Sequence, residues 1–444
     1  MKIAIIGGGF TGLCAAAKLI KQGARVTVFE RDLQLGGLAT YQDYGTFYWD
    51  RYYHVILPSD KHLLTFLKDI GLGDTVKWES TKTGYYVDQK FYSVSNTREF
   101  LEFPPLRIWN KIRLAFTIYL GSWIRNWRNL EKTTTSEWLI KVGGKQNYEK
   151  FWKPLLLAKL GSYHDKVSAV FIWSYIKRLF EARKSSDQQE KLGFLSGGYK
   201  SVFDKLEKII SDDGTVLKNT TVDFIEPHAQ NGILVGHQGH QEHFDKVIFT
   251  GPTSLLNKLV SPDLVKVKQD HIVEYLGVIC LVLITRKELS PFYVLNLADA
   301  SIPFTGVIGM SSLVNIQYTG NHYITYFPKY LSSKDPLFSK DNRYLAEVFI
   351  EGVKKLYPEL NDEDIVSSHL HKASKVQPLQ VVNYSQMIPS ITTLHPDFFI
   401  LNTSQFVNDT LNNNSVARHV NHFMEDFEDQ LLGHRNQKKE VVND

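Results

Sequence analysis

The stretch IAIIGGGFTGLCAAAKLIKQGARVTVFE, residues 3–30, decides the fold of this chain. It begins with an apolar run and continues with three glycines and a fourth glycine three positions later. A helical segment, a second apolar run and an acidic residue complete it. This order predicts a strand, a glycine turn, a helix and a second strand, which together form a dinucleotide-binding unit. The sequence therefore predicts an α/β protein with a Rossmann-type domain.

Each glycine of this turn has its own physical task. Gly7 allows the tight turn, Gly9 lets the backbone approach a pyrophosphate, and Gly12 lets the helix pack closely on the strand. The free N–H groups at the helix start, reinforced by the helix dipole, then face the anion. Glu30, at the end of the second strand, is placed to accept hydrogen bonds from a ribose 2′-hydroxyl and would repel a 2′-phosphate.

The composition is that of a globular protein. The 444 residues are 43% hydrophobic and 22% charged, and the length suggests about two or three domains. A net charge of +4 is too small to indicate a nucleic-acid partner. Cys14 and Cys280 lie in apolar stretches, so we expect buried thiols of a reducing compartment and no metal site. The first strand begins directly after Met1, which leaves no room for a signal peptide and predicts a cytoplasmic protein.

Patterns of the nucleotide domain return twice further along the chain. A Gly-Gly pair precedes an amphipathic helix at about 199–211, and a strand at 246–249 leads into Gly251. A buried-strand run at 398–401 then precedes a helix at about 415–431. Two interleaved domains explain this order better than two consecutive ones. The predicted nucleotide domain comprises residues 1–55, 193–262 and 390–432, the α+β substrate domain comprises 56–192 and 263–389, and 433–444 form a polar tail.

A second glycine pair follows the acidic residue. After Arg31 comes LGGLAT at 35–40, which permits another close backbone approach to a dinucleotide. With DRYYHVI at 50–56, FWKPLL at 151–156 and FLSGG at 194–198, the chain resembles a superfamily of FAD proteins. That superfamily includes amine oxidases, protoporphyrinogen oxidases and phytoene desaturases. The likeness is greatest to a bacterial subgroup of NAD(P)/FAD-dependent oxidoreductases that carries Gly-Gly-Leu-Ala in place of Gly-Gly-Arg.

The resemblance covers nearly the whole chain and implies FAD bound to a two-domain fold. The residues that it implies for the cofactor come from both glycine motifs and from three later segments. They are Gly7, Gly8, Gly9, Phe10, Thr11, Gly12, Glu30, Arg31, Gly36, Gly37, Leu38, Ala39, Val222, Gly251 and Asn414.

The sequence departs from the family pattern in two places. Relatives often carry Glu-His-Thr after a Pro-Phe segment, whereas this chain has GMS at 309–311. Near the C-terminus they often carry Asp-Arg-Gly before Thr-Asn, whereas this chain has TLN at 410–412 before two asparagines. Both departures fall where the family approaches the flavin ring and the substrate, and they leave the adenine end unchanged.

Candidates for catalysis come from two segments. The resemblance places the segment of Tyr53 and His54 beside the flavin ring, and an imidazole can move protons near neutral pH. The alternative for His54 is a structural histidine at the domain junction. Lys159 lies in an apolar helical setting, where burial would favour its neutral, basic form. The alternative is a lysine that pairs with a carboxylate or extends to solvent.

Residues 104–130 combine basic and aromatic side chains and contain no acidic residue. Two interpretations fit this pattern: a helix that contacts an anionic membrane surface, or an aromatic face packed inside the substrate domain with the cations in solvent. Membrane contact would make the protein peripheral and would favour a lipid or polyprenoid substrate. The basic residues are Arg107, Lys111, Arg113, Arg125 and Arg128, and the apolar residues at helical spacing are Leu106, Trp109, Ile112, Phe116, Leu120, Trp123 and Trp127.

These observations predict an FAD-dependent oxidoreductase that takes a hydride from a hydrophobic small molecule. One alternative is flavin use without net oxidation, as in the related UDP-galactopyranose mutase. Another is an FAD-binding protein without catalysis, which the two departures favour. No nucleic-acid partner is expected, and the sequence indicates no particular oligomeric state.

Overall fold

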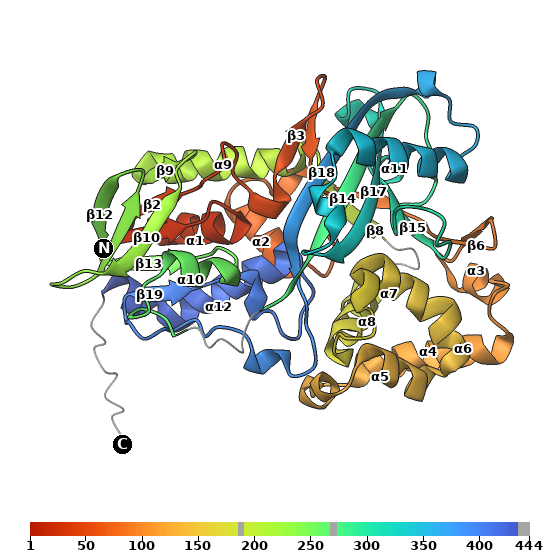
Figure 1. Cartoon of the computed structure of the whole chain (residues 1–444), viewed down its shortest axis with the longest axis horizontal. Helices are drawn as coiled ribbons and strands as arrows, with labels where there is room; N and C mark the ends of the chain where they lie inside the picture. The colour runs from red at the N-terminus through yellow and green to blue at the C-terminus, as the bar shows by residue number, and fades with distance from the viewer. Residues whose placement is uncertain (185–190, 267–272, 434–444) are drawn as a thin grey trace.

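The computed structural model describes residues 1–184, 191–266 and 273–433. Apart from Gly433, the predicted polar tail therefore lies outside the described residues. Figure 1 shows a Rossmann-type region on the left, a large twisted sheet at the upper right and a group of helices at the lower right. The chain passes between these regions several times, so each is assembled from separate segments.

The Rossmann-type region is built on a five-stranded parallel sheet of order β19-β13-β1-β2-β9. Its strands come from three distant parts of the chain, and helices α1, α9 and α12 share its main core. The α/β class and the Rossmann-type fold are confirmed. The elements are β1 Lys2–Ile6, α1 Phe10–Lys21, β2 Arg25–Phe29, α9 Gly198–Asp213, β9 Thr215–Leu217, β13 Lys246–Phe249, β19 Phe398–Ile400 and α12 Asn413–Leu432.

The large sheet has seven strands in the order β18-β14-β17-β16-β15-β6-β7. All neighbours are antiparallel except β15 and β6. Residues 83–94 form a hairpin, with Asp88 and Gln89 at positive φ in its turn. The elements are β6 Thr83–Val87, β7 Lys90–Ser93, β14 Tyr275–Thr285, β15 Val294–Leu297, β16 Gly306–Gly309, β17 Tyr323–Ser332, α11 Asn342–Leu356 and β18 Ile365–Pro378.

The helical region is formed by residues 97–184. Its core includes Leu114, Leu139, Leu156 and Trp173. The described helices include none with the length and apolar character needed to cross a bilayer. The elements are α3 Thr97–Glu102, α4 Ile108–Trp123, α5 Thr135–Gly143, α6 Lys145–Asn147, α7 Lys153–Leu160 and α8 Ala169–Lys184.

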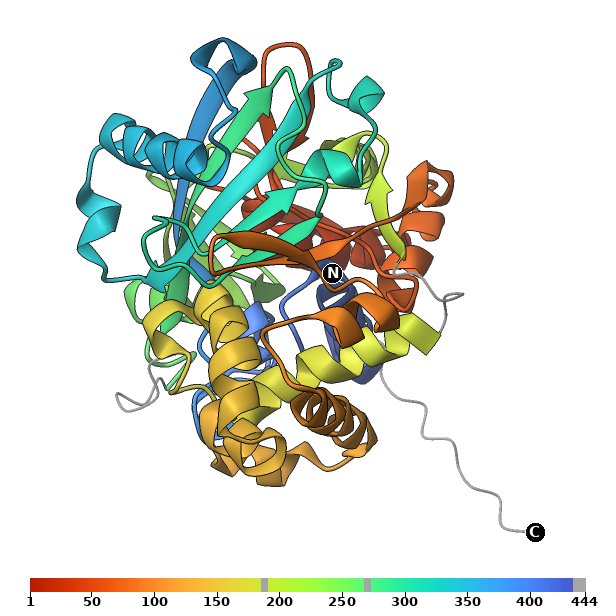
Figure 2. The ribbon, with the colours of Figure 1, turned by 90° about the vertical axis from the view of Figure 1, so that its right-hand side faces the viewer.

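Helix α4 occupies only part of the predicted stretch 104–130. It packs on α5 and α8 through Leu114, Thr117 and Gly121, and Figure 2 shows it at the outer edge of the helical region. The alternative in which the aromatic face packs inside the domain is therefore wrong for α4. Leu106, before the helix, is buried, and Trp127 lies beyond its end.

Smaller elements connect these regions. A three-stranded sheet of β10, β11 and β12 forms a separate core with part of the parallel sheet. The remaining elements are β3 Tyr41–Asp43 paired with β4 Tyr48–Asp50, α2 Lys61–Asp69, β5 Val76–Ser80 paired with β8 Lys191–Leu195, β10 Val222–Pro227, β11 Ile233–His237, β12 His240–Phe244 and α10 Leu256–Leu259.

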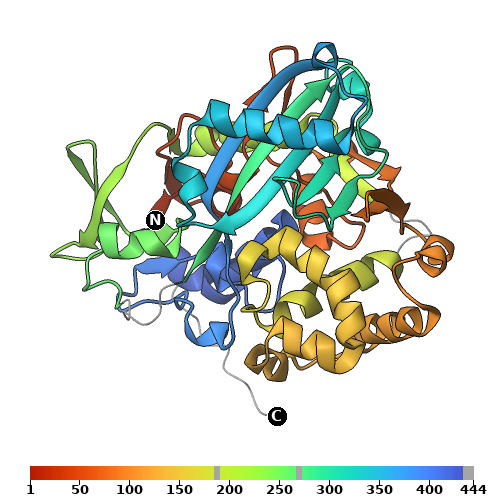
Figure 3. The same ribbon diagram turned by 45° about the vertical axis from the view of Figure 1, so that its right-hand side comes forward.

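The nucleotide domain continues beyond the boundary predicted at residue 55, because α2 packs in the core of that domain. Its buried side chains Leu63, Phe66 and Leu67 belong to the core that α1 and α12 share. This short helix has one strongly apolar face, and that face packs against α12 and the core of the nucleotide domain. The nucleotide domain therefore extends through α2 before the chain enters the large sheet. Figure 3 shows the large sheet, with α11 across it, above the helical region.

Candidate cofactor and substrate site

The glycine turn after β1 is held tightly by the backbone. Gly7 has φ +116°, and its N–H donates to the carbonyl of Phe29 at 2.9 Å. A Cβ at Gly12 would lie 2.1 Å from the carbonyl oxygen of Gly7, so glycine is required there for α1 to pack against the turn. A Cβ at Gly9 would meet only the Cα of Gly37, at 3.9 Å. Gly9 therefore leaves open space at the start of α1, as a bound pyrophosphate would require.

The second glycine pair lies directly against this turn. Gly36 donates its N–H to the carbonyl of Gly8 at 2.8 Å, and both Gly36 and Gly37 have positive φ. A Cβ on Gly36 would enter the ring of Phe203. Leu38 and Ala39 continue as a short 3-10 turn. The two motifs thus form one continuous backbone surface, although Gly9 and Gly36 are 27 positions apart along the chain.

Glu30 is a buried carboxylate at the end of β2. Its Oε2 accepts the N–H of Gly8 at 2.7 Å and its Oε1 accepts the N–H of Asp32 at 2.9 Å. Burial raises the pKa of Glu30 above its usual value of 4.5, while these two hydrogen bonds oppose the increase. The side chain of Arg31 is exposed and pairs with the carboxylate of Asp32. Glu30 is therefore the fixed acceptor at this end of the site.

We expect FAD affinity to fall as the pH is lowered through the pKa of Glu30. The carboxylate accepts hydrogen bonds on both oxygens, whereas the protonated carboxyl also carries a donor and accepts more weakly. Because burial raises this pKa, the loss begins at a higher pH than for an exposed glutamate. Titrating the apoprotein with FAD at several pH values measures it. Glu30→Gln should bind more weakly and flatten the pH profile, and a pH profile unchanged in that variant would contradict the assignment.

The remaining predicted cofactor residues occupy the same end of the parallel sheet. The N–H of Thr220 donates to the carbonyl of Glu30 at 2.8 Å, which brings the start of β10 at Val222 beside Glu30. The carbonyl of Gly251, after β13, accepts from the side chain of Asn402, after β19, at 3.0 Å. Carboxyl ends of parallel strands are where open α/β sheets bind ligands. The side chains of Phe10 and Thr11, by contrast, are buried, and the ring of Phe10 packs against Phe66 and Tyr199.

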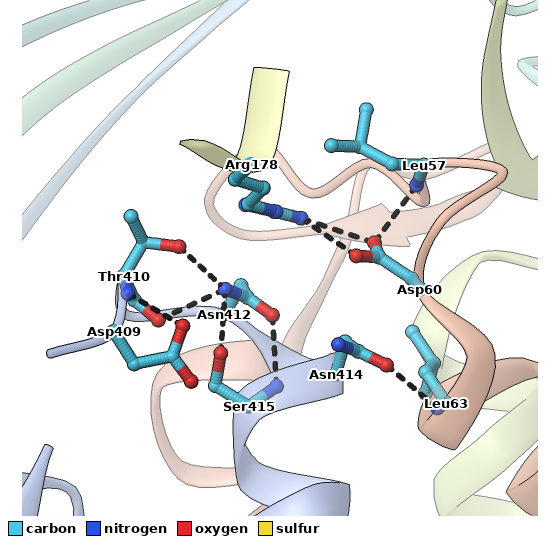
Figure 4. A network of polar contacts seen from close by, with 9 residues as sticks. All are labelled: Leu57, Asp60, Leu63, Arg178, Asp409, Thr410, Asn412, Asn414 and Ser415. Carbon is cyan, nitrogen blue, oxygen red and sulfur yellow. Dashed lines mark hydrogen bonds and ion pairs between the residues drawn. The ribbon is translucent and has the colours of Figure 1, made fainter. Parts of the chain in front are cut away.

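The start of α12 carries a polar cap built from one of the two departures. The side-chain oxygen of Asn412 accepts the N–H of Ser415 at 2.9 Å, and its amide donates to the carbonyl and hydroxyl of Thr410. Asn414 accepts the N–H of Leu63 at 3.1 Å and so joins α12 to α2 (Figure 4). The stretch 410–412 therefore forms an ordered helix cap, in which the side-chain oxygen of Asn414 already has a protein donor.

The segment 50–54 lies between the Rossmann-type region and the large sheet. The side chain of Asp50 accepts the N–H of Tyr199 on α9 at 2.7 Å, and its carbonyl accepts the hydroxyl of Tyr326 on β17 at 2.6 Å. The hydroxyls of Tyr53 and Tyr330 are 2.8 Å apart. His54 faces the other way, with its ring 5.2 Å from the ring of Tyr199. The two adjacent candidates therefore point into different regions.

Lys159 lies on the side of Tyr53. Its Nζ is 4.9 Å from the ring centre of Tyr175 on α8. Tyr175 lies close enough to Tyr330 to contribute to the raised pKa of that phenol. Burial raises the pKa of Tyr53 and Tyr330 well above 10, so both phenols are neutral at physiological pH. The structure thus groups Lys159 with Tyr53 and leaves His54 apart.

Two histidines of this region were not predicted from the sequence. His369 and His371 lie on β18 opposite Val282 and Cys280 of β14, on the sheet face that contacts Tyr52 and Tyr44. Burial lowers the pKa of His371 to about 3, so its imidazole is neutral. The alternation of His-Leu-His at 369–371 was the available signal, since it places both rings on one face of a strand.

The residues present fit a dinucleotide that spans this junction. Space is open at Gly9, and an acceptor is fixed at Glu30. Nε of Arg51 is buried and has no hydrogen-bond partner among the described residues; Nδ1 of His54, which lies 3.8 Å from a carboxylate oxygen of Asp50, has none there either. A small cavity also lies where α8, the end of β18 and residues 403–411 meet. FAD would be held by the two glycine motifs and Glu30, with polar groups of the segment 50–54 available to its other end.

Comparisons with known proteins agree with this geometry. The model of the family described as flavin containing amine oxidoreductase matches residues 10–394. The 15-cis-phytoene desaturase of Synechococcus elongatus is 25% identical over 293 residues, which cover 59% of this chain and 60% of that enzyme. This chain therefore matches less than two thirds of that relative.

Solved structures show the same fold. An oxidoreductase from Methanosarcina mazei has a TM-score of 0.73 at 20% identity and covers 96% of this chain and 100% of that one. Reduced UDP-galactopyranose mutase has a TM-score of 0.67 at 16% identity, with 97% of each chain covered. The match of the family model confirms the predicted superfamily, the flavin cofactor and the class of FAD-dependent oxidoreductases. This chain belongs to the family of flavin-containing amine oxidoreductases.

Proposed function

We propose that this protein is an FAD-dependent oxidoreductase that takes a hydride from an uncharged, hydrophobic small molecule of the lipid or polyprenoid class. The observation that carries the proposal is the neutral character of the sheet face opposite Tyr53. A charged substrate placed against such a face would lose its hydration without gaining a counter-charge. A hydrophobic substrate would lose nothing there and would gain from burial.

Three strands supply this face. Val278, Cys280 and Val282 of β14 lie beside Tyr326 and Tyr330 of β17 and beside the two histidines of β18. Burial raises the pKa of Tyr326 and of the Cys280 thiol and lowers that of His369, so each of these groups is neutral at physiological pH. Asp50, the nearby acid, is already engaged by the N–H of Tyr199.

The chain itself contributes positioning and exclusion of water. Bound FAD supplies the hydride acceptor, so the protein needs no strong acid or base for C–H cleavage. The hydrogen bond between Tyr53 and Tyr330 fixes two aromatic rings at the junction, and Tyr175 and Lys159 continue the same surface toward the helical region. The name of the relative from Synechococcus elongatus, a phytoene desaturase, supports a polyprenoid substrate class.

The two alternatives are less well supported by the residues present. UDP-galactopyranose mutase shares the fold, but a nucleotide sugar carries an anionic diphosphate, and the tyrosine, cysteine and histidine side chains of this face are uncharged. The alternative of a non-catalytic protein is based in part on the departure from the family pattern at 309–311. There, Met310 is buried, and the hydroxyl of Ser311 accepts the N–H of Ile324 at 2.8 Å. That segment therefore stabilises the sheet and brings no titratable side chain to the face.

The visible spectrum of the FAD-loaded protein under anaerobic conditions tests the proposal. We expect a membrane lipid extract or phytoene in detergent to bleach the flavin, and putrescine and UDP-galactopyranose to leave it oxidised. Bleaching by putrescine alone would overturn the hydrophobic substrate. Conversion of UDP-galactopyranose would favour the mutase, and a flavin that no compound reduces would favour the non-catalytic protein.

Replacing Tyr53 by phenylalanine links the reaction to the proposed face. We expect Tyr53→Phe to bind FAD normally and to slow anaerobic reduction by about fivefold, because one positioning hydrogen bond is worth about 1 kcal/mol. Stopped-flow absorbance measures the rate. Tyr92→Phe, in the hairpin β6–β7, is the matched control and should reduce at the normal rate. A Tyr53→Phe protein that reduces as fast as the control would show that substrate does not bind against Tyr53.

A further inference from the structure

Helix α4 carries an unusual concentration of exposed apolar side chains. Six of the seventeen large apolar side chains that are exposed on the described surface lie within its 16 residues. Trp109 is 78% exposed, Trp123 65% and Phe116 56%. We name this surface the α4 outer face, and its members are Ile108, Trp109, Ile112, Phe116, Tyr119 and Trp123. Contiguous apolar patches of this kind mark interaction sites.

The packing of the helix fixes this face outward. A Cβ at Gly121 would already lie 3.3 Å from the side chain of Ile176 on α8, and a Cβ at Gly143 of α5 would lie 3.2 Å from the hydroxyl of Thr117. Rotation of α4 to cover its aromatic residues would expose Leu114 and break these close contacts. The members of the α4 outer face span an arc of roughly 100°, since each residue turns the helix by about 100°.

The charged residues of the stretch 104–130 are all positive. Arg107 precedes the helix, Arg125 and Arg128 follow it, and Arg113 lies on its exposed side, while residues 104–130 contain no acid. The guanidinium of Arg113 donates to the carbonyl of Val142 at 2.9 Å, which holds that cation beside the helix. An anionic membrane surface attracts basic side chains by about 1 kcal/mol each.

We propose that the α4 outer face is a membrane-contact surface that lies in the headgroup region of an anionic bilayer. Tryptophan and tyrosine favour that boundary, because they combine an apolar ring with a polar N–H or O–H group. A second copy of the chain is a poorer occupant, because a symmetric contact across α4 would bring like charges together. The proposal concerns binding alone, so it holds or fails independently of the redox reaction.

Vesicle flotation of the FAD-loaded protein tests the proposal. We expect flotation with vesicles of phosphatidylcholine and phosphatidylglycerol, and much less with phosphatidylcholine alone or at high salt. The triple variant Trp109→Ser, Phe116→Ser and Trp123→Ser should bind at least about 100-fold more weakly, because three aromatic side chains no longer enter the bilayer. Tyr344→Ser with Leu394→Ser is the control, since these side chains are similarly exposed elsewhere and their loss should leave flotation unchanged.

A second readout separates membrane contact from misfolding. Brominated lipid should quench the tryptophan fluorescence of the wild type, and Trp109→Phe with Trp123→Phe should still float but lose most of that quenching. Flotation of the triple variant at the wild-type level would overturn the proposal, as would equal binding to neutral vesicles. A wild-type dimer that the triple variant converts to monomer, without flotation of either, would assign the face to a second copy instead.

Discussion

Gly9→Ala is expected to weaken FAD binding by about 10- to 100-fold, because an added methyl group in a closely packed contact costs about 1–3 kcal/mol. The apoprotein should be as stable as the wild type. The backbone at Gly9 has φ −72° and ψ 173°, which alanine adopts without strain, and the added Cβ would meet no atom closer than 3.9 Å. The methyl group would occupy only the space that the pyrophosphate needs.

Two other glycines provide controls for this variant. Gly12→Ala should destabilise the apoprotein itself, because its Cβ would lie 2.1 Å from a backbone oxygen. Gly73→Ala should change neither property, since its nearest contact is an ordinary 3.4 Å. FAD titration and thermal unfolding of the apoprotein measure the two effects. Wild-type affinity in Gly9→Ala would place the pyrophosphate elsewhere, and a lower unfolding temperature would make Gly9 a structural residue.

The nucleotide unit could be predicted from sequence because its determinants are local. Gly7, Gly9, Gly12 and Glu30 lie within one strand–turn–helix–strand stretch, and each meets a backbone requirement set by its near neighbours. The same holds for the hairpin at 83–94, where two turn residues separate two alternating runs. Predictions of this kind depend on spacing along the chain, which the sequence displays directly.

The large sheet and the junction could not be predicted in this way. Tyr53 meets Tyr330 across 277 residues, and the pairing depends on the register of β17 rather than on any local pattern. Periodicity identified an amphipathic helix near 104–130, but only the packing of α4 on α8 reveals which face is outside. The domain boundary predicted at residue 55 lies too early for the same reason. Helix α2 packs against α12, which follows it by more than 340 residues.

A buried ion pair ties the helical region to the nucleotide domain. The guanidinium of Arg178, on α8, donates to both carboxylate oxygens of Asp60 at 3.2 and 3.0 Å (Figure 4). Asp60 is only 2% exposed and also accepts the N–H of Leu57 at 2.8 Å. It directly precedes α2, whose Leu63 is held by Asn414 of α12. The ion pair therefore joins α8 to α2 and, through α2, to the capped start of α12.

Arg178→Ala is expected to lower the free energy of unfolding by about 3 kcal/mol, because it leaves the buried carboxylate of Asp60 without its counter-charge. Asp60→Asn should cost less, since the Arg178 side chain is 23% exposed and its charge can turn toward water. Urea unfolding monitored by tryptophan fluorescence measures both variants.

The double variant Asp60→Asn with Arg178→Met supplies the decisive comparison. Removing both charges together leaves no unpaired ion, so the double variant should be more stable than Arg178→Ala alone. The affinity for FAD should rank the variants in the same order as their stability does. Asp60 holds the start of α2, and α2 in turn holds the start of α12. Equal losses in the two single variants would mean that water screens the pair, and the link between α8 and the nucleotide domain would then rest on apolar packing.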